Sequence, residues 1–196
     1  MFETKGPEIK SGSLQDNEPV DFWTDQEIEI LTDYTLDGNE TRLTCSYKGL
    51  PTTVKPGDKV IVGENILTCE VLECLDNSIR VKCLNDAHIE ERMSMNLPGC
   101  VIDLPSLTDK DWTDISNFGI EKGIDMVCVS FIRKPEDVEE VREVMGSKGA
   151  HVKIIAKIEN QEGLNNFPSI LEAADGVSIS WSDLCMEIPP EKVFIA

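Results

Sequence analysis

The order of apolar and polar positions changes near the middle of the chain, which indicates two kinds of structure. From Val20 to about Cys83, short segments rich in β-forming residues alternate with turn-forming residues. This pattern predicts strands at 27–32, 41–47, 59–62, 66–73 and 78–84. Turn signals at 37–39, 55–58 and 76–78 separate them. We therefore expect a small β domain in this part of the chain.

After residue 99 the spacing becomes helical. Thr108 and Asp111 have the spacing of a capping box, and they open a predicted helix over 108–123. Its apolar stripe would consist of Trp112, Ile115, Phe118 and Ile120. A second helix should begin near Pro135, place Val138, Val141 and Val144 or Met145 on one face, and end around Gly146.

Short apolar runs alternate with these helices. The runs 124–131, 152–158 and 176–180 have the length and composition of buried parallel strands. The segment 163–174 can supply the helix between the last two, and 187–196 begins a further helix. Strands alternating with helices indicate βαβ units around a parallel sheet, so we expect an α/β fold here.

Composition excludes several classes of protein. The chain has 37 acidic and 18 basic side chains, and its formal net charge of −19 would repel a nucleic acid backbone. It has no apolar run of ~18 residues and no apolar leader, so neither membrane spanning nor export is indicated. Seven cysteines without a Cys-x-x-Cys pair argue against a disulfide framework or a zinc site. A cytoplasmic location follows.

The densest polar group lies at the end of the predicted strand 152–158. Lys157 and Glu159 are two residues apart, so they share one face of the strand while Ile158 points to the other. The next strand ends just before Asp183, and neighbouring strands lie ~4.8 Å apart. Glu159 and Asp183 could therefore both bind one Mg²⁺ ion. Spacing alone leaves an exposed ion pair and a loop cap as the alternative.

Six strings in the chain carry a resemblance to a known family. They are TKGPEI at 4–9, NLPG at 96–99, SFIRK at 130–134, KIENQEG at 157–163, DL at 183–184 and EIP at 187–189. In this order and at about this spacing, they resemble the pyruvate kinase family over the whole length of the chain.

The resemblance implies a fold and a division into domains. It implies a partial TIM (β/α) barrel with an inserted small β-barrel-like lid domain. Residues 1–11 would be barrel strand 3, residues 12–97 the lid, and residues 98–196 barrel strands 4–6 with their helices. The family transfers the phosphoryl group of phosphoenolpyruvate to ADP in glycolysis, which gives pyruvate and ATP. It uses Mg²⁺ (or Mn²⁺) and K⁺, and its full-length members are usually homotetramers.

The resemblance also implies roles for particular residues. Lys157 matches the lysine that offsets charge on the phosphoryl group in transfer. The other implied roles are Mg²⁺ binding by Glu159 and Asp183, K⁺ binding by Glu3 and Thr4, substrate binding by Ser182 and Asp183, and nucleotide binding by Lys10 and Arg92.

Several positions depart from the family pattern. Glu3 replaces an aspartate, Lys10 replaces an arginine, and Met93 replaces a lid lysine, for which the neighbouring Arg92 is the expected substitute. Around Asp183, Trp181 stands in place of an arginine, and Ser182 and Cys185 stand in place of glycines that let the backbone approach the substrate. The altered loop at 181–185 is expected to change shape.

Three functions are weighed against these observations. The first is a pyruvate kinase-type phosphotransferase, here a truncated form expected to lack turnover alone because half a barrel cannot close. The second is a non-catalytic relative that binds partners through exposed sheet edges. The third is another phosphoenolpyruvate-linked barrel enzyme, which the inserted β domain and the NLPG junction disfavour.

Overall fold

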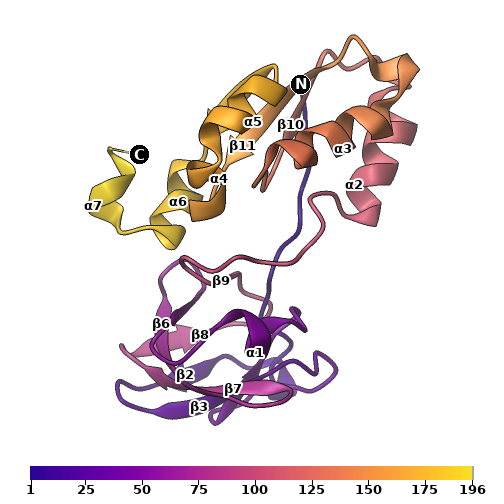
Figure 1. Cartoon of the computed structure of the whole chain (residues 1–196). Helices are drawn as coiled ribbons and strands as arrows, with labels where there is room; N and C mark the ends of the chain where they lie inside the picture. Colours follow the sequence, from indigo (N-terminus) through magenta and orange to yellow (C-terminus); the bar gives the residue numbers. More distant parts are fainter. Residues whose placement is uncertain (196) are drawn as a thin grey trace. The chain divides into compact units, whose positions relative to one another are not determined.

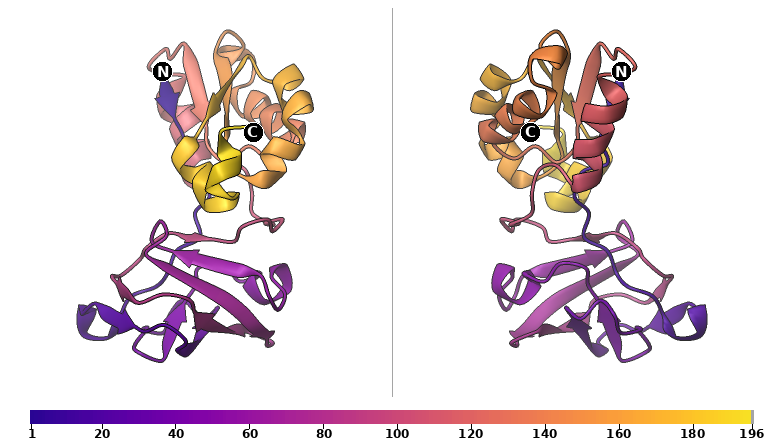
Figure 2. Two further views of the ribbon diagram at one scale, coloured as in Figure 1. Left: turned by 90° about the vertical axis from the view of Figure 1, so that its left-hand side faces the viewer. Right: turned by 90° about the vertical axis from the view of Figure 1, so that its right-hand side faces the viewer.

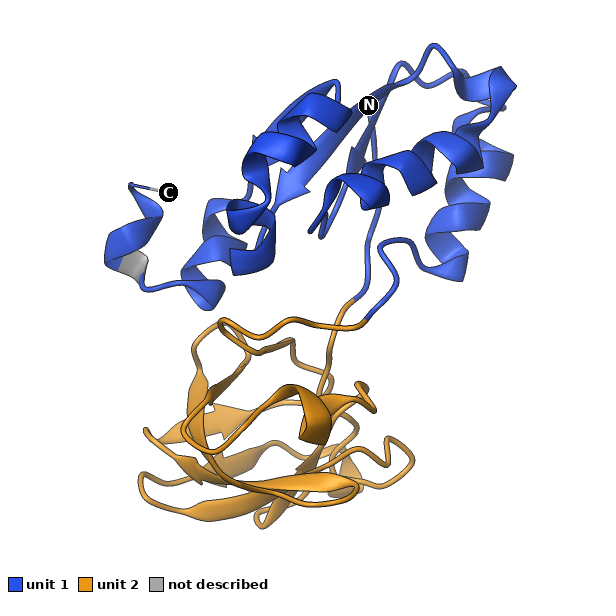
Figure 3. Ribbon diagram, in the orientation of Figure 1, with its two compact units in different colours: residues 1–7, 104–196 blue, residues 8–103 orange. Residues whose placement is uncertain are grey.

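The computed structural model describes residues 1–195 and divides the chain into two compact units (Figure 3). The α/β unit comprises Met1–Pro7 and Leu104–Ala196, and the β unit comprises Glu8–Asp103, so the β unit is inserted within the sequence of the α/β unit. The boundaries between the two units lie between residues 7 and 8 and between residues 103 and 104. The boundaries expected from the sequence lie between residues 11 and 12 and between residues 97 and 98.

The β unit is built on a six-stranded sheet with the strand order β4-β3-β7-β6-β5-β9. The strands are β3 (Glu27–Leu31), β4 (Arg42–Thr44), β5 (Lys59–Val62), β6 (Leu67–Cys74), β7 (Ser78–Cys83) and β9 (Met95–Asn96). A second, two-stranded sheet pairs β2 (Val20–Phe22) with β8 (Ala87–Ile89). The unit also has a short helix, α1 (Leu50–Thr53), and a 3-10 turn at Gln15–Asn17. All five strands predicted in this region are confirmed.

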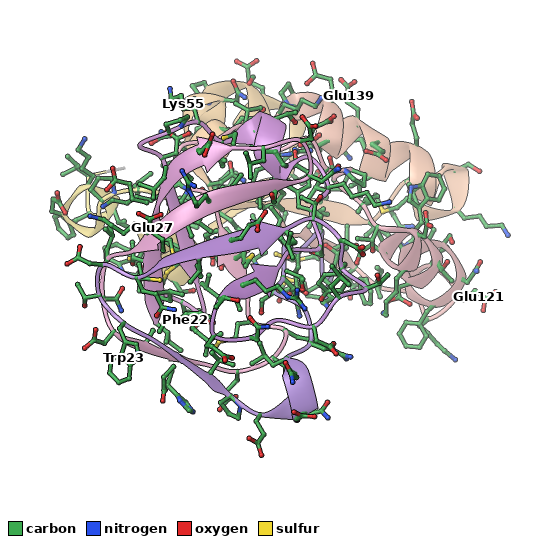
Figure 4. All side chains as sticks on the ribbon, turned by 90° about the horizontal axis from the view of Figure 1, so that it is seen from below. Phe22, Trp23, Glu27, Lys55, Glu121 and Glu139 are labelled. Carbon is green, nitrogen blue, oxygen red and sulfur yellow. The ribbon has the colours of Figure 1, made fainter. Side chains whose placement is uncertain are left out.

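Alternating burial explains why these segments form strands. Along β3, Ile28 and Ile30 point into the core, whereas Glu27 points to solvent. At the end of β2, Phe22 is fully buried and the following Trp23 is exposed; Figure 4 shows both side chains. A residue period of two is the period of a pleated strand, so one face of each strand packs inward and the other remains hydrated.

The α/β unit contains a four-stranded parallel sheet with the order β1-β10-β11-β12. Its strands are β1 (Phe2–Glu3), β10 (Met126–Val129), β11 (Lys153–Ile158) and β12 (Gly176–Ile179). Helices α3 (Pro135–Met145) and α5 (Phe167–Ala173) lie side by side along β10 and β11 (Figures 1 and 2). The register places Lys157 beside Ser178 of β12. The α/β fold with a parallel sheet is thus confirmed for this unit.

The core of the α/β unit determines which face of the sheet carries the polar groups. Ile154, Ala156 and Ile158 of β11 pack with Val141 of α3 and Ile170 of α5. Because side chains alternate along a strand, the odd-numbered residues of β11 point to the opposite face. That face is the one on which Lys157 projects.

The first predicted helix of this unit is correct at its start, whereas only half of its predicted apolar stripe faces the core. The capping box of Thr108 and Asp111 is present, and α2 (Asp109–Thr113) follows it. The chain then continues as a π-helix, η2 (Asp114–Gly119), in which Ile120 N donates to Ile115 O at 3.0 Å. Ile115 lies in the core and Ile120 packs against it, whereas Trp112 is 44% and Phe118 is 54% exposed. The π-helix changes the spacing after residue 114, so Phe118 no longer follows Ile115 on one face.

The remaining helices differ from prediction in three places. The predicted helix over 163–174 is split into α4 (Gln161–Asn165) and α5, and a 3-10 turn, η3 (Ser147–Gly149), follows α3. Residues 181–185, expected as a loop, lie instead in α6 (Trp181–Glu187). Helix α7 (Pro190–Val193) falls within the helix predicted over 187–196, whose end at Ala196 lies outside the described residues. No helix within residues 1–195 is both long and apolar enough to span a bilayer.

Candidate functional site

The candidate site is centred on the carboxyl end of β11, where the chain leaves the sheet. Lys157 Nζ lies 2.8 Å from Glu159 Oε1, so the two side chains share a face, as their spacing predicts. Ile158 between them is fully buried on the other face. The Lys157 side chain is 17% exposed and that of Glu159 is 10% exposed, so this ion pair is partly withdrawn from water.

Lys157 is held by three acceptors from three strand ends. Besides Glu159, its Nζ contacts Glu3 Oε1 at 2.7 Å and Ser130 Oγ at 3.3 Å. Burial by itself lowers the pKa of the ammonium, but the hydrogen bonds and charges of Glu159 and Glu3 outweigh this effect. The net result is a Lys157 pKa above its usual value, so the side chain stays a fixed positive charge at neutral pH.

Glu159 is the most deeply placed carboxylate of this group. Its Oε2 accepts a hydrogen bond from the backbone N–H of Phe131 at 2.9 Å, while its Oε1 faces Lys157. Burial raises the pKa of Glu159, and the hydrogen bond from Lys157 acts in the opposite direction. The negative charge of Asp183 also raises the pKa, because Asp183 is near enough to repel the carboxylate.

Asp183 lies in the first turn of α6, which follows β12. Its Oδ2 accepts a hydrogen bond from Ser180 Oγ, the residue that precedes the helix. Trp181, Ser182 and Asp183 are all exposed. No residue from 180 to 187 has a positive φ. The side chains at Ser182 and Cys185 therefore impose no backbone strain, and this segment is a regular helix rather than a glycine-dependent loop.

Thr4, one of the two predicted K⁺ ligands, is buried just after β1 and makes three hydrogen bonds with β10 and with Ser130, which follows β10. Its N–H donates to Cys128 O at 2.9 Å, and its hydroxyl accepts from Ser130 N at 3.0 Å. Its carbonyl oxygen accepts from Ser130 Oγ at 2.9 Å. Ser130 thus touches both Thr4 and Lys157, and the ends of β1, β10 and β11 form one connected cluster.

Lys10 and Arg92, the predicted nucleotide ligands, lie in the β unit on two paired segments. Lys10 forms an isolated bridge with Ser94, and Arg92 N donates to Gly12 O at 3.1 Å. The Lys10 ammonium lies 3.0 Å from a carboxylate oxygen of Glu8. Arg92 is exposed and has a φ of 55°, which is the left-handed region. The structure therefore brings these two residues onto adjoining backbone of one unit.

The donor chemistry of the cluster suits a hard divalent cation. Among the described residues, no group of three His, Cys, Asp or Glu side chains converges to hold a metal alone. Two carboxylates with open positions for water or substrate oxygens are a common Mg²⁺ arrangement. Glu3 and Glu159 contact the Lys157 ammonium, and Asp183 lies near enough to Glu159 to raise its pKa. A cation of charge +2 would balance the excess negative charge of these three carboxylates.

Two members of the cluster have no predicted role from the sequence. Ser130 and Phe131 belong to the SFIRK string, but nothing in their spacing indicates that they contact Lys157 and Glu159 across 27 and 28 residues. The pairing of Glu3 with Lys157 was also not foreseen, because it spans 154 residues. The one usable signal was the parallel sheet, which brings the carboxyl ends of its strands together.

Comparisons with known proteins agree on one family. The model of the pyruvate kinase barrel domain matches residues 1–196. Pyruvate kinase of Eimeria tenella is 44% identical over 196 residues, which is all of this chain and 37% of that protein. The cytosolic isozyme of pyruvate kinase from Solanum tuberosum is 43% identical over 198 residues, covering all of this chain and 39% of that protein. The chain thus spans about two fifths of the length of these relatives.

Solved structures give the same answer. A crystal structure of a pyruvate kinase from Cryptosporidium parvum has a TM-score of 0.95 and 40% identity, and the match covers 98% of this chain and 40% of that one. Another structure of Cryptosporidium parvum pyruvate kinase, in complex with ADP, has a TM-score of 0.86 and 40% identity, covering 98% of this chain and 39% of that one. The chain belongs to the pyruvate kinase family.

Proposed function

We propose that this chain carries the divalent-metal and lysine part of a pyruvate kinase site, which transfers the phosphoryl group of phosphoenolpyruvate to ADP in the cytosol. The observation that carries the proposal is the cluster of Lys157, Glu159 and Asp183 at the carboxyl ends of β11 and β12. In α/β barrels, catalytic groups project from these strand ends. The α/β unit would then be part of a (β/α) barrel, with the β unit as its inserted lid.

Each residue has a role that its surroundings support. Lys157, kept protonated by two carboxylates, would stabilise the negative charge on the transferred phosphoryl group. Glu159 and Asp183 would hold Mg²⁺ or Mn²⁺, and the bound metal supplies Lewis-acid stabilisation of substrate oxygens. Ser182, beside Asp183 in the exposed first turn of α6, would contact the substrate.

The remaining assignments concern K⁺ and the nucleotide. Glu3 and Thr4 would contribute oxygen ligands to K⁺ at the end of β1, next to the cluster. The positive charges of Lys10 and Arg92 would bind the phosphates of ADP, a ligand present in one of the Cryptosporidium parvum structures. Of these two, Arg92 carries the planar fork that suits bidentate phosphate contact.

Metal binding tests the proposal directly. Titration of the 196-residue chain with Mn²⁺, followed by calorimetry or electron paramagnetic resonance, should show one site. Glu159→Gln and Asp183→Asn should each weaken that site by about tenfold or more, because each removes one anionic ligand. Glu172→Gln is the matched control, because Glu172 is an exposed carboxylate of α5. The Glu172→Gln variant should bind Mn²⁺ with the same affinity as the unmodified chain.

Substrate binding separates this function from a non-catalytic interaction module. Phosphoenolpyruvate should bind only when Mn²⁺ is present, and Lys157→Met should weaken its binding without abolishing that of the metal. A module that acts only by contacting partners needs to bind neither. Absence of both Mn²⁺ and phosphoenolpyruvate binding from the folded chain would overturn the proposed function.

We further propose that the chain alone binds these ligands without turnover. Within the described residues, β1 and β12 are the edges of the parallel sheet, and Ile179 on β12 is 51% exposed. A closed barrel has no such edges. A coupled assay of pyruvate formation should show no activity above background, and a rate near that of a complete pyruvate kinase would contradict this.

A further inference from the structure

Phe131 has a backbone conformation that needs an explanation. It follows β10 and has a φ of 61°, which lies in the left-handed region. Within residues 1–7 and 104–195 it is the only residue other than glycine with a positive φ. A bulky side chain makes this conformation unfavourable, and such conformations persist where the surrounding structure fixes them and are concentrated at functional sites.

The chain is fixed by buried contacts on both sides of Phe131, at Ser130 and at Arg133. On one side, Ser130 exchanges two hydrogen bonds with Thr4. On the other side, Arg133 N donates to Asp137 Oδ2 at 2.8 Å, and the Arg133 guanidinium lies over the Phe131 ring at 5.4 Å from its centroid. The turn from β10 into α3 is therefore held at both ends, and its geometry determines where the Phe131 N–H points.

The result of this geometry is a hydrogen bond to the candidate metal ligand. The Phe131 N–H donates to Glu159 Oε2 at 2.9 Å, while Glu159 Oε1 is 2.8 Å from Lys157 Nζ. Each carboxylate oxygen thus has its own partner on a different strand end. Two contacts of this kind fix the rotation of the carboxylate plane, which a single ion pair with a flexible lysine does not.

We propose that Phe131 is a positioning residue for Glu159: its left-handed backbone directs its N–H at Glu159 Oε2 and so sets the orientation in which Glu159 meets Lys157 and the divalent cation. The part of this inference that concerns the cation rests on the proposed function. The backbone of Phe131 carries this role, whereas its ring lies against the Arg133 guanidinium.

Two substitutions separate the backbone from the ring. Phe131→Gly removes the ring but adopts the left-handed conformation without steric cost, so its affinity for Mn²⁺ should stay within about twofold of the unmodified chain. Phe131→Val also removes the ring, but a β-branched residue disfavours this conformation, so Mn²⁺ should bind about tenfold or more weakly. Equal weakening in both variants, or no weakening in either, would overturn the proposal.

Amide hydrogen exchange tests the hydrogen bond itself, without any metal. In the metal-free chain, the Phe131 amide should exchange at least about tenfold faster in Glu159→Ala than in the unmodified protein, because its acceptor is gone. The Ser130 amide, which donates to Thr4 Oγ1, is the internal control and should keep its rate. Unchanged exchange at Phe131 would overturn the proposal, even if Phe131→Val does not fold.

The two experiments also keep the proposals apart. If the unmodified chain binds no Mn²⁺ and no phosphoenolpyruvate, the proposed function fails, and hydrogen exchange in the metal-free chain alone decides whether Phe131 holds Glu159. If Mn²⁺ binds but the Phe131 amide does not respond to loss of Glu159, the proposed function stands and the positioning role fails.

Discussion

Lys157 Nζ lies 2.8 Å from Glu159 Oε1, and the one residue between them in the sequence, Ile158, is fully buried on the opposite face. The pleat of the strand puts both charges on one face, and the packing of Ile158 against the helices keeps them there. Burial raises the pKa of Glu159, and the neighbouring ammonium opposes that effect.

Removing the ammonium should make Glu159 harder to ionise. In Lys157→Met the pKa of Glu159 should rise further above its usual value, because burial and the charge of Asp183 then act with less opposition. A pH titration of the Glu159 side-chain carboxyl carbon by NMR measures this directly. Lys148→Met, on an exposed position of η3, is the control and should leave the titration unchanged. A fall in the Glu159 pKa in Lys157→Met would contradict the assignment of Lys157 as its main stabilising partner.

Local patterns predicted the parts of the site that lie close together in sequence. The two-residue spacing of Lys157 and Glu159 was enough to place them on one face, and a parallel sheet was enough to bring Asp183 near Glu159. The contacts with Glu3 and Phe131 depend on how distant strands meet. No periodicity encodes a backbone N–H aimed at a carboxylate from another strand, so those contacts were out of reach of the sequence.

The same division applies to the fold. Strong periodic segments such as β5, and the helix that begins at Pro135, were predicted within a residue. The sequence pattern does not predict helix α6, because the helix is short and only Leu184 within it packs in a core cluster. The partners of Leu184 in that cluster, Ile188 and Val193, lie beyond the end of the helix. The π-turns of η2 were missed because an apolar stripe read at 3.6 residues per turn assumes a regular α-helix.

Asp175 should contribute pH-dependent stability to the α/β unit. Its carboxylate accepts hydrogen bonds from Ile154 N at 3.0 Å, Lys153 Nζ at 2.9 Å and Arg142 at 3.1 Å, which together lower its pKa to about 2. Because its side chain is still partly hydrated, Asp175→Asn should lower the free energy of unfolding at pH 7 by about 1 to 2 kcal/mol. Denaturant titration followed by circular dichroism measures the loss.

The sign of the pH effect follows from the lowered pKa. The stabilisation by Asp175 is fully present above the unfolded-state value of ~3.9 and is lost as the pH falls through about 2. The difference in free energy of unfolding between Asp175→Asn and the unmodified chain should therefore shrink as the pH falls from about 4 to about 2, the range between the unfolded and folded pKa values. Asp125→Asn, at an exposed aspartate of the same unit, is the control for the loss of one carboxylate. A stability difference between Asp175→Asn and the unmodified chain that grows as the pH falls would contradict a lowered pKa for Asp175 in the folded protein.

Gly163 should not tolerate a side chain. A Cβ at this buried position in α4 would lie 2.8 Å from Ile132 O, a backbone atom of the turn that contains Phe131. Gly163→Ala should therefore destabilise the protein by about 1 to 3 kcal/mol, because helix α4 must move away from the backbone at Ile132 to make room for the methyl group. Gly176→Ala is the matched control: its Cβ would meet only the flexible end of Ile155 at 3.0 Å. Chemical denaturation of both variants checks this, and equal costs would show that the close approach to Ile132 is not limiting.

The cysteines should differ in reactivity according to burial. Cys45, Cys69, Cys83 and Cys128 are buried, whereas Cys74, Cys100 and Cys185 are partly exposed. Burial raises the pKa of Cys45 to about 11, and the hydrogen bond to Cys83 together with burial raises that of Cys69, so few thiolates form at these sites. An aromatic disulfide reagent should therefore label the four buried thiols only after unfolding in denaturant.

Among the partly exposed cysteines, Cys185 should react first. Cys74 Sγ donates to Val54 O at 3.3 Å and Cys100 Sγ donates to Asp58 Oδ2 at 3.8 Å, so each of these thiols already has an acceptor in the folded protein. Charges of Asp58 and Glu73 also raise the pKa of Cys74, after the effect of burial. Under native conditions, the fastest phase of labelling should therefore come from Cys185, which mass spectrometry of the labelled protein would identify. Cys185→Ser should remove that phase. Persistence of the fast phase in that variant would mean that burial and hydrogen bonding do not order the reactivity of these thiols.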